Sequence, residues 1–356
     1  MKENLNWGLF SKYRTEIYGV ATIMIMIFHC QVAFTMPAII YNTIVNNLNY
    51  GVDIFLLLSG ICLYFSFNKD SNYSSFIKKR CERTLIPYMI IGFFYWVWKY
   101  LIAEFSILDF IYNATGLSLF LIKRDNYLVF GKATMWYVAF IMLMYALYPF
   151  IYKALFTVSQ KKQTANISLM LIFSVGIPLF IKAYTVDSYN IAEVWMTRLP
   201  VFLIGCYFGK AVKEKQKFNI RDYILFFMFI PIKLFVSLVI KPDDVIFHRY
   251  LGLFGAFLIC FLIVFVLEAL SNVKFIIKPT KQILSFFGKL SLEIYMTHVM
   301  LYTIVLFYIP DLRTTDTIAY RYKILIYIGV LVIATIVSFI FNKVYNAILK
   351  NKKAIK

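Results

Sequence analysis

Apolar stretches long enough to cross a lipid bilayer recur from one end of this 356-residue chain to the other. A helix rises about 1.5 Å per residue, so roughly 20 apolar residues cross the hydrocarbon core of a membrane. The sequence therefore predicts an all-α, polytopic membrane protein with about ten transmembrane helices. The predicted spans are 16–35, 50–67, 85–102, 134–153, 167–184, 195–211, 222–240, 249–270, 289–308 and 323–345.

The composition excludes an ordinary soluble protein. Hydrophobic residues make up 61% of the chain and charged residues only 15%, and a soluble domain cannot keep that much apolar surface from water. One more apolar run, 107–122, contains Asp109, Asn113 and Gly116. We interpret it as an interfacial or re-entrant piece of an outer loop. The chain shows no internal repeat and no soluble appendage, so residues 1–356 are predicted to form a single membrane domain.

The positions of the basic residues predict the orientation. Most of the 37 Lys and Arg residues fall in alternate connecting segments, and the segment 36–49 contains none. Short cytoplasmic segments are enriched in Lys and Arg, so both termini are predicted to be cytoplasmic and the protein to lie in the cell membrane. The net charge of +19 is then a topology signal. Nucleic acid is not expected as a partner, because the charges are scattered and form no recognition motif.

Two titratable residues lie at similar depth on the first two predicted spans. His29 is thirteen residues after Glu16, roughly 20 Å from the cytoplasmic edge, and Asp53 is about one turn from the outer end of the next span. Titratable groups within a span usually face the bundle interior. An aspartate beside the imidazole would fix its tautomer. The alternatives are a histidine that only hydrogen-bonds between helices, and an aspartate that caps a helix.

Near the outer ends of two other spans lie Trp136, Tyr137 and Arg198. These residues are candidates for binding the acceptor substrate or stabilising charge. The aromatic pair also fits an interfacial belt, and the arginine also fits a side chain that extends to the outer headgroups.

On the predicted inner face, Lys78, Lys79, Arg80 and Arg83 precede a helix that has Pro87 near its start. The two arginines are three positions apart and should point the same way on a helical turn. Two guanidinium groups on one face suit a phosphate-rich ligand, because each can bind bidentately. The alternative is basic charge that only flanks a span.

The ninth span carries a polar stripe formed by Ser291, Tyr295 and His298. Their i, i+4 and i+7 spacing places them on one helix face. This stripe predicts a substrate wall or a hydrogen-bonded helix seam. His298 is a second catalytic candidate, with a structural role as the alternative.

Taken in order, six motifs resemble the acyltransferase 3 family of membrane O-acyltransferases, and the resemblance covers almost the entire chain. The motifs are "YRTEIYGVATIMIMIFH", "GVDIFLLLSG", "KKRCERTLIPY", "MWYVAFIMLMYALYP", "RLPVFLIGCYFGK" and "FFGKLSLEIYMTHVMLY". The resemblance implies transfer of an acyl group, most often acetyl, from cytoplasmic acyl-CoA to a hydroxyl of an extracytoplasmic or lipid-linked glycan. It identifies His29 as the essential histidine of the first helix. It assigns the acyl donor to Arg80 and Arg83, and Lys78 and Lys79 are expected to assist.

The sequence departs from the family pattern in two places. Many members carry an arginine three turns before the histidine, where this chain has Tyr18, and Arg14 lies one turn earlier. Many relatives also have a C-terminal esterase-like domain. This chain is expected to end after its tenth helix, and so either to acylate the acceptor itself or to hand the group to a separate extracytoplasmic transferase. A homo-oligomer is the other partner considered.

The expected chemistry places His29 as general base on the acceptor hydroxyl, with Asp53 orienting its ring. Acylation of the imidazole itself is the alternative. The candidate donors to the oxyanion are Tyr137, Arg198 and a backbone N–H. Acetyl-CoA is the predicted donor substrate, and no metal is expected because the five cysteines show no metal-site spacing. The rival function is a transporter or flippase for a lipid-linked sugar, since intramembrane charges also mark such pathways.

Overall fold

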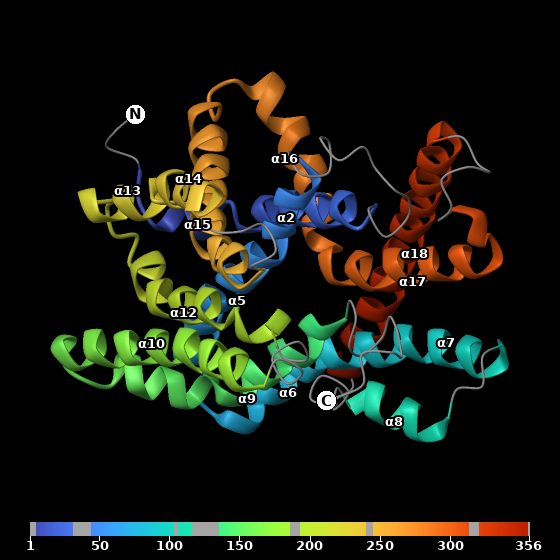
Figure 1. The fold of residues 1–356 in the computed structure, drawn as a ribbon, viewed down its shortest axis with the longest axis horizontal. Coiled ribbons are helices and arrows are strands. Elements are labelled where there is room, and N and C mark those ends of the chain that lie inside the picture. The colour runs from blue at the N-terminus through green and yellow to red at the C-terminus, as the bar shows by residue number, and fades with distance from the viewer. Residues whose placement is uncertain are drawn as a thin grey trace.

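The computed structural model describes residues 5–30, 44–102, 106–115, 135–185, 193–239, 245–312 and 320–354. Helices dominate this part of the chain, and it contains no β-strand (Figure 1). Eight helical segments in it are long and apolar enough to cross a membrane. The predicted all-α, polytopic membrane fold is therefore confirmed.

The eight segments coincide with eight of the ten predicted spans. They are built from α5 (Tyr50–Lys69), α7 (Ile86–Ile102), α9 (Trp136–Phe156), α10 (Gln160–Tyr184), α13 (Ile220–Phe227) with α14 (Phe229–Val239), α15 (Val245–Ala269), α17 (Ser291–Tyr308) and α18 (Tyr320–Ala354). The other two predicted spans correspond to α2 (Arg14–Phe28) and α12 (Leu199–Lys213), which have 15 residues each. Residues 31–35 of the first span lie outside the described part.

Four further α-helices of the described part lie between the predicted spans. Three occupy segments predicted to face inward: α1 (Gly8–Lys12), α6 (Tyr73–Arg80) and α16 (Lys274–Lys289). The fourth, α8 (Ile107–Thr115), falls in the run expected to be interfacial or re-entrant, and its nine residues are too few to cross a bilayer. Residues 116–122 of that run lie outside the described part.

The helices α2 and α5 occupy the centre of the molecule, with α12 beside α5, α16 beside α2, and α17 and α18 along one side (Figure 1). Two glycines allow α5 and α12 to pack closely. A Cβ at Gly60 would collide with the backbone of Phe202, and one at Gly205 with the backbone of Leu57. Small residues permit such close approach between membrane helices. The helices α5 and α12 are thereby held in a fixed relation.

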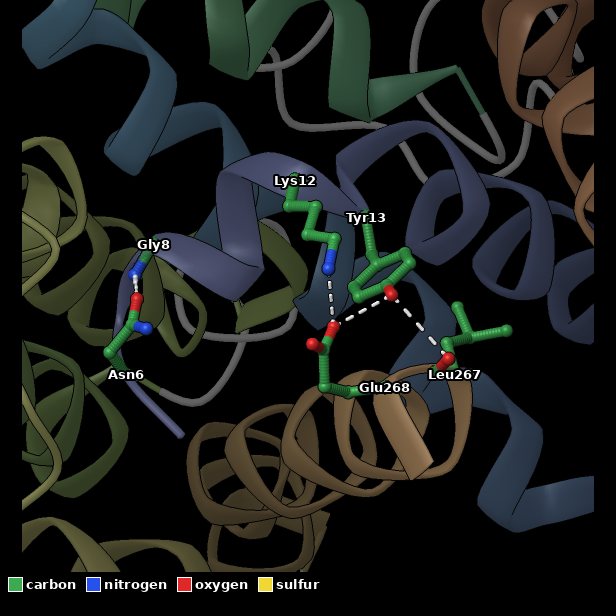
Figure 2. A network of polar contacts seen from close by, with 6 residues as sticks. All are labelled: Asn6, Gly8, Lys12, Tyr13, Leu267 and Glu268. Atoms are coloured by element: carbon green, nitrogen blue, oxygen red, sulfur yellow. Dashed lines mark hydrogen bonds and ion pairs between the residues drawn. The ribbon is translucent and has the colours of Figure 1, made fainter. Parts of the chain in front are cut away.

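A polar network near the N-terminus joins α1 to the end of α15 (Figure 2). The Tyr13 hydroxyl donates to Glu268 at 2.8 Å, and the Lys12 ammonium lies 2.5 Å from the same carboxylate. The ammonium groups of Lys12 and Lys281 both lie 4.9 Å from the centre of the Tyr13 ring. Burial, together with the hydrogen bond to Glu268, raises the pKa of Tyr13. The network fixes the start of α2 against α15.

Candidate active site

Two histidines that are 269 positions apart in the sequence meet in the structure. His29 follows the last residue of α2, and His298 lies in the middle of α17, where only 1% of it is exposed. His29 Nδ1 and His298 Nε2 are 2.8 Å apart, and the ring centres are 5.0 Å apart. The packing of α2 against α17 therefore joins the two predicted catalytic histidines in one hydrogen bond.

The hydrogen bonds determine which nitrogen carries a proton when both rings are neutral. His298 Nδ1 lies 2.5 Å from the carbonyl oxygen of Ile294, which can only accept, so Nδ1 carries the hydrogen. Nε2 of the same ring then has a lone pair and accepts from His29 Nδ1. His29 Nε2 is left without a hydrogen and is the basic atom of the pair.

Asp53 does not contact His29, so the predicted role of this aspartate in orienting that ring is wrong. Its Oδ1 atom lies 3.3 Å from Nε of Arg198, and the two residues are 1% and 3% exposed. The Arg198 guanidinium also donates to the side chain of Asn49 and to the carbonyl of Val194. Helix α5 begins at Tyr50 with Asn49 as its N-cap residue, which removes the capping alternative for Asp53.

The charged cluster at this end of α5 is balanced. A second ion pair, Arg249 with Glu193 at 3.0 Å, lies close enough to influence the first electrostatically. Trp136 lies under the guanidinium of Arg198, 5.4 Å from ring centre to Cζ, and is itself buried. Their burial argues against a headgroup contact for Arg198 and a belt position for Trp136. Opposite charges are needed here because an unpaired buried charge is costly.

A cavity of about 140 Å³ lies among α2, α5, α9 and α17. Eleven residues line it, and seven of them carry a hydroxyl group: Tyr18, Ser59, Thr84, Tyr137, Tyr145, Ser291 and Tyr295. By the predicted orientation, Thr84 and Ser291 lie near the inner ends of their helices, and Tyr137 lies near an outer end. Side chains from both predicted halves of the membrane therefore converge on this cavity.

Tyr295 lies between this cavity and the histidine pair. Its ring lines the cavity, and its centre is 5.8 Å from that of Tyr137 and 6.5 Å from that of His298. The Tyr137 hydroxyl is 3.2 Å from the hydroxyl of Ser59. The stripe predicted on the ninth span is thus a wall of the cavity at Ser291 and Tyr295, and a hydrogen-bonded seam at His298.

The predicted basic site lies at α6 and the π-helical turn that follows it, Cys81–Leu85. The Arg80 guanidinium is half-buried, with its Cζ 5.2 Å from the ring centre of Phe76 and 5.3 Å from that of Tyr145. Arg83 is exposed. The two arginines therefore differ in burial, and the expectation that both point the same way stays a prediction.

Pro87 explains the π turn. A proline lacks the N–H that would bond to the carbonyl four residues back, and its ring clashes with that carbonyl. In the structure the N–H of Ile86 bonds to the carbonyl of Cys81, five residues back, so the turn is wider than in an α-helix. In this wider turn, the side chains of residues three positions apart diverge more than they do in an α-helix.

The two lysines of the basic segment differ in their surroundings. Lys78 and Lys79 are both exposed, and Lys79 lies 2.8 Å from Asp70. This bond to Lys79, with further hydrogen bonds from Ser75 and Asn72, lowers the pKa of Asp70 to about 2. Asp70 therefore stays ionised at neutral pH and pairs with Lys79 at the surface, whereas Lys78 has no such partner in the described part of the chain.

Sequence reasoning missed Tyr145, Ser59 and Thr84 as cavity residues, and the pair formed by Glu193 and Arg249. A hydroxyl group on a predicted span is a weak signal, because serine and threonine also bond within their own helix and tyrosine is common in membrane proteins near the interface. Which of these residues share a cavity depends on how the helices pack.

The comparisons with known proteins agree with the motifs. A family model described as an acyltransferase domain matches residues 19–343. No curated protein and no solved structure is similar enough to this chain to count as a match.

Proposed function

The chain belongs to the acyltransferase 3 family, and on this premise we propose that it transfers an acetyl group from cytoplasmic acetyl-CoA to a hydroxyl of an extracytoplasmic or lipid-linked glycan. Family and fold together make it a multi-pass membrane acyltransferase. The acetyl-CoA donor, the glycan acceptor and a location in the cell membrane belong to the proposal.

The single observation that carries this proposal is the hydrogen bond between His29 and His298. Because the Ile294 carbonyl fixes the tautomer of His298, the pair directs a lone pair onto His29 Nε2. A neutral imidazole with a fixed tautomer is suited to general-base catalysis. In this scheme His29 is the catalytic residue, and His298 is a positioning residue that acts through it.

The proposed reaction is balanced without a metal or a redox partner. His29 Nε2 takes the proton of the acceptor hydroxyl as that oxygen forms a bond to the thioester carbonyl carbon. The tetrahedral intermediate then collapses, the C–S bond breaks, and the thiolate takes the proton back from the imidazolium. The products are an ester and free CoA. The Tyr137 hydroxyl and a backbone N–H are the candidate donors to the oxyanion, since the Arg198 guanidinium is engaged by Asp53 and Asn49.

For the donor, we propose that the CoA phosphates bind to Arg83, Arg80 and Lys78. Arg83 and Lys78 are exposed and form no ion pair within the described part of the chain. The Arg80 guanidinium lies against the ring of Tyr145, and Tyr145 also lines the cavity. The pantetheine arm would follow the hydroxyl-lined cavity, which offers hydrogen-bond partners to its two amides. The acceptor candidates Trp136 and Arg198 are both buried, and Arg198 is engaged by Asp53 and Asn49. The proposal therefore gives them a positioning role rather than contact with the glycan.

The test uses sealed vesicles that contain the purified protein, labelled acetyl-CoA outside and candidate glycans inside. We expect the parent to release CoA and to label a glycan, and His29→Ala to slow transfer by about 10²- to 10⁴-fold, the usual contribution of a general base. Thr303→Val on α17, where the hydroxyl donates to the Val299 carbonyl of its own helix, is the matched control and should act like the parent.

Three results would decide between the alternatives. A His29→Ala variant as fast as the parent would refute the catalytic assignment. A transporter would move the glycan without consuming acetyl-CoA. Label found on His29 of the parent, trapped before acceptor is added, would favour the acyl-imidazole route over the general base.

A further inference from the structure

The carbonyl group of Glu82 lies in the π turn and lacks a backbone donor for a simple chemical reason. In a ladder of i to i+5 bonds its partner would be residue 87, which is a proline and has no N–H. The N–H of Ile86, its partner in an ordinary α-helix, is bonded to Cys81 instead. Glu82 is half-buried, so this carbonyl needs either water or another donor, and to the extent that it is buried an unmade hydrogen bond costs free energy.

A side chain from the far end of the sequence supplies the missing donor. The Tyr345 hydroxyl on α18 donates to the Glu82 carbonyl at 2.5 Å, across 263 positions of sequence. The ring of Tyr345 is stacked on Phe341, one turn earlier on the same helix, with the ring centres 5.7 Å apart and the planes 6° apart. The stacking fixes the direction of the hydroxyl.

The geometry of this turn determines the direction of the basic side chains around it. Thr84, within the turn, lines the cavity, and Arg80, just before it, lies against the ring of Tyr145. Rewinding the turn as an α-helix would rotate the residues before it by roughly 100° relative to α7, the angle per residue of an α-helix. Such a rotation would take Arg80 away from Tyr145.

We propose that Tyr345 is a positioning residue for the acyl donor, which holds the π turn so that Arg80 and Arg83 keep the directions needed to bind the CoA phosphates. This inference rests on the proposed function. It goes further by giving the last helix a role in donor binding that the motifs do not assign to it. Tyr345 bonds to the backbone of the turn that carries Thr84, and its ring contact is with Phe341, so we expect its effect to fall on donor binding.

The test compares Tyr345→Phe with the parent in the purified, vesicle-bound protein. This change removes the hydroxyl and keeps the ring that stacks on Phe341. We expect the KM for acetyl-CoA to rise about 3- to 10-fold, the equivalent of one lost hydrogen bond, and kcat to stay within about twofold. Tyr322→Phe, at an exposed tyrosine of the same helix whose hydroxyl accepts from the neighbouring Arg321, is the control and should change neither constant.

A second variant isolates the mechanism. Pro87→Ala restores an N–H at residue 87, so that the Glu82 carbonyl regains a donor within its own helix. In the Pro87→Ala background, Tyr345→Phe should change the KM by less than about twofold. A KM that rises equally in both backgrounds, or that does not rise in the parent background, would overturn the assignment.

A readout that does not need turnover separates this inference from the proposed function. Cys81 is half-buried in the turn, and its rate of labelling by a maleimide can be followed on its own peptide by mass spectrometry. We expect Tyr345→Phe to change this labelling rate at least threefold in the parent. In the Pro87→Ala background, the same substitution should have no such effect. If the parent does not consume acetyl-CoA, the proposed function fails, and the labelling rate still decides the role of Tyr345. An unchanged labelling rate would refute it.

Discussion

At the scale of single residues, the site depends on which ring nitrogens carry a hydrogen in a chain of three hydrogen-bonded groups. The Ile294 carbonyl accepts from His298, which in turn accepts from His29. Each neutral histidine therefore has one donor and one acceptor nitrogen, and the chain of bonds leaves the acceptor at His29 Nε2. A partner that orients a catalytic imidazole is often a carboxylate. Here the nearby carboxylate, Asp53, is engaged by Arg198 instead.

Substitutions at His298 test this arrangement. His298→Phe removes the acceptor for His29 Nδ1 and should lower kcat by about 10- to 100-fold, because the tautomer of His29 is no longer fixed. His298→Gln keeps a side-chain carbonyl that can accept the same hydrogen. On a logarithmic scale, its loss of kcat should therefore be no more than half that of His298→Phe. The measurement is kcat at saturating acetyl-CoA, with the amount of folded protein matched. Equal rates for the two variants would argue against a positioning role.

The partner of His29 was beyond sequence reasoning for a physical reason. Depth along a helix can be counted from the sequence, and it placed His29 and Asp53 at similar levels. Which faces of the helices meet is set by packing, and α2 turns His29 towards α17. Asp53 instead faces Arg198 and Gly252, where a Cβ would collide with the carboxylate.

At the scale of helices, the centre of the molecule is organised by close contacts between α5 and α12. The helix α5 supplies Asp53 to the charged cluster and Ser59 to the cavity, and α12 begins immediately after Arg198. The glycine contacts between the two helices therefore set the position of the site residues as well as the packing.

Glycine substitutions should reveal this contact. Gly60→Val and Gly205→Val place a side chain where backbone already lies, and we expect each to destabilise the protein by at least about 1–3 kcal/mol. Gly329→Val on α18, where no other atom lies within 4 Å of an added Cβ, is the matched control and should leave stability unchanged. Thermal unfolding in detergent is the measurement, and equal melting temperatures for all three variants would contradict the packing described.

Helix boundaries show where sequence patterns predict well and where they do not. The predicted spans 50–67 and 167–184 match α5 and α10 to within two residues at three of their four ends, because hydropathy changes sharply there. The helix α16 was missed as a helix, since its lysines marked it as a connecting segment. The π turn at Cys81–Leu85 was missed because the effect of Pro87 on helix geometry depends on whether another group, here Tyr345, can satisfy the displaced carbonyl.

At the scale of the whole molecule, the fold brings a basic segment, a hydroxyl-lined cavity and a histidine pair into one sequence of contacts. Arg80 touches Tyr145, Tyr145 and Tyr295 line the cavity, and Tyr295 adjoins His298. A donor that is bound by its phosphates at one end and reacts at the other needs such an extended site. Family membership alone does not predict which side chains form it.

Labelling of single introduced cysteines tests the predicted orientation. In intact cells or right-side-out vesicles, Lys162→Cys and Lys278→Cys should be inaccessible to a membrane-impermeant maleimide until the membrane is opened, because both lie in segments predicted to be cytoplasmic. Thr185→Cys, exposed at the other end of α10, should be labelled at once. The reverse pattern would contradict the predicted orientation, because it would place the basic segment on the face of the membrane opposite to cytoplasmic acetyl-CoA.

The central claim is that His29 and His298 act as one unit, and a double-mutant cycle on the purified protein tests it most directly. Single-turnover rates of acetyl transfer would be compared for the parent, His29→Ala, His298→Phe and the double variant. Because residues that act through one another lose their effects together, the account predicts that the double variant is no slower than His29→Ala alone. Losses that multiply, or a His29→Ala variant that keeps the rate of the parent, would contradict it.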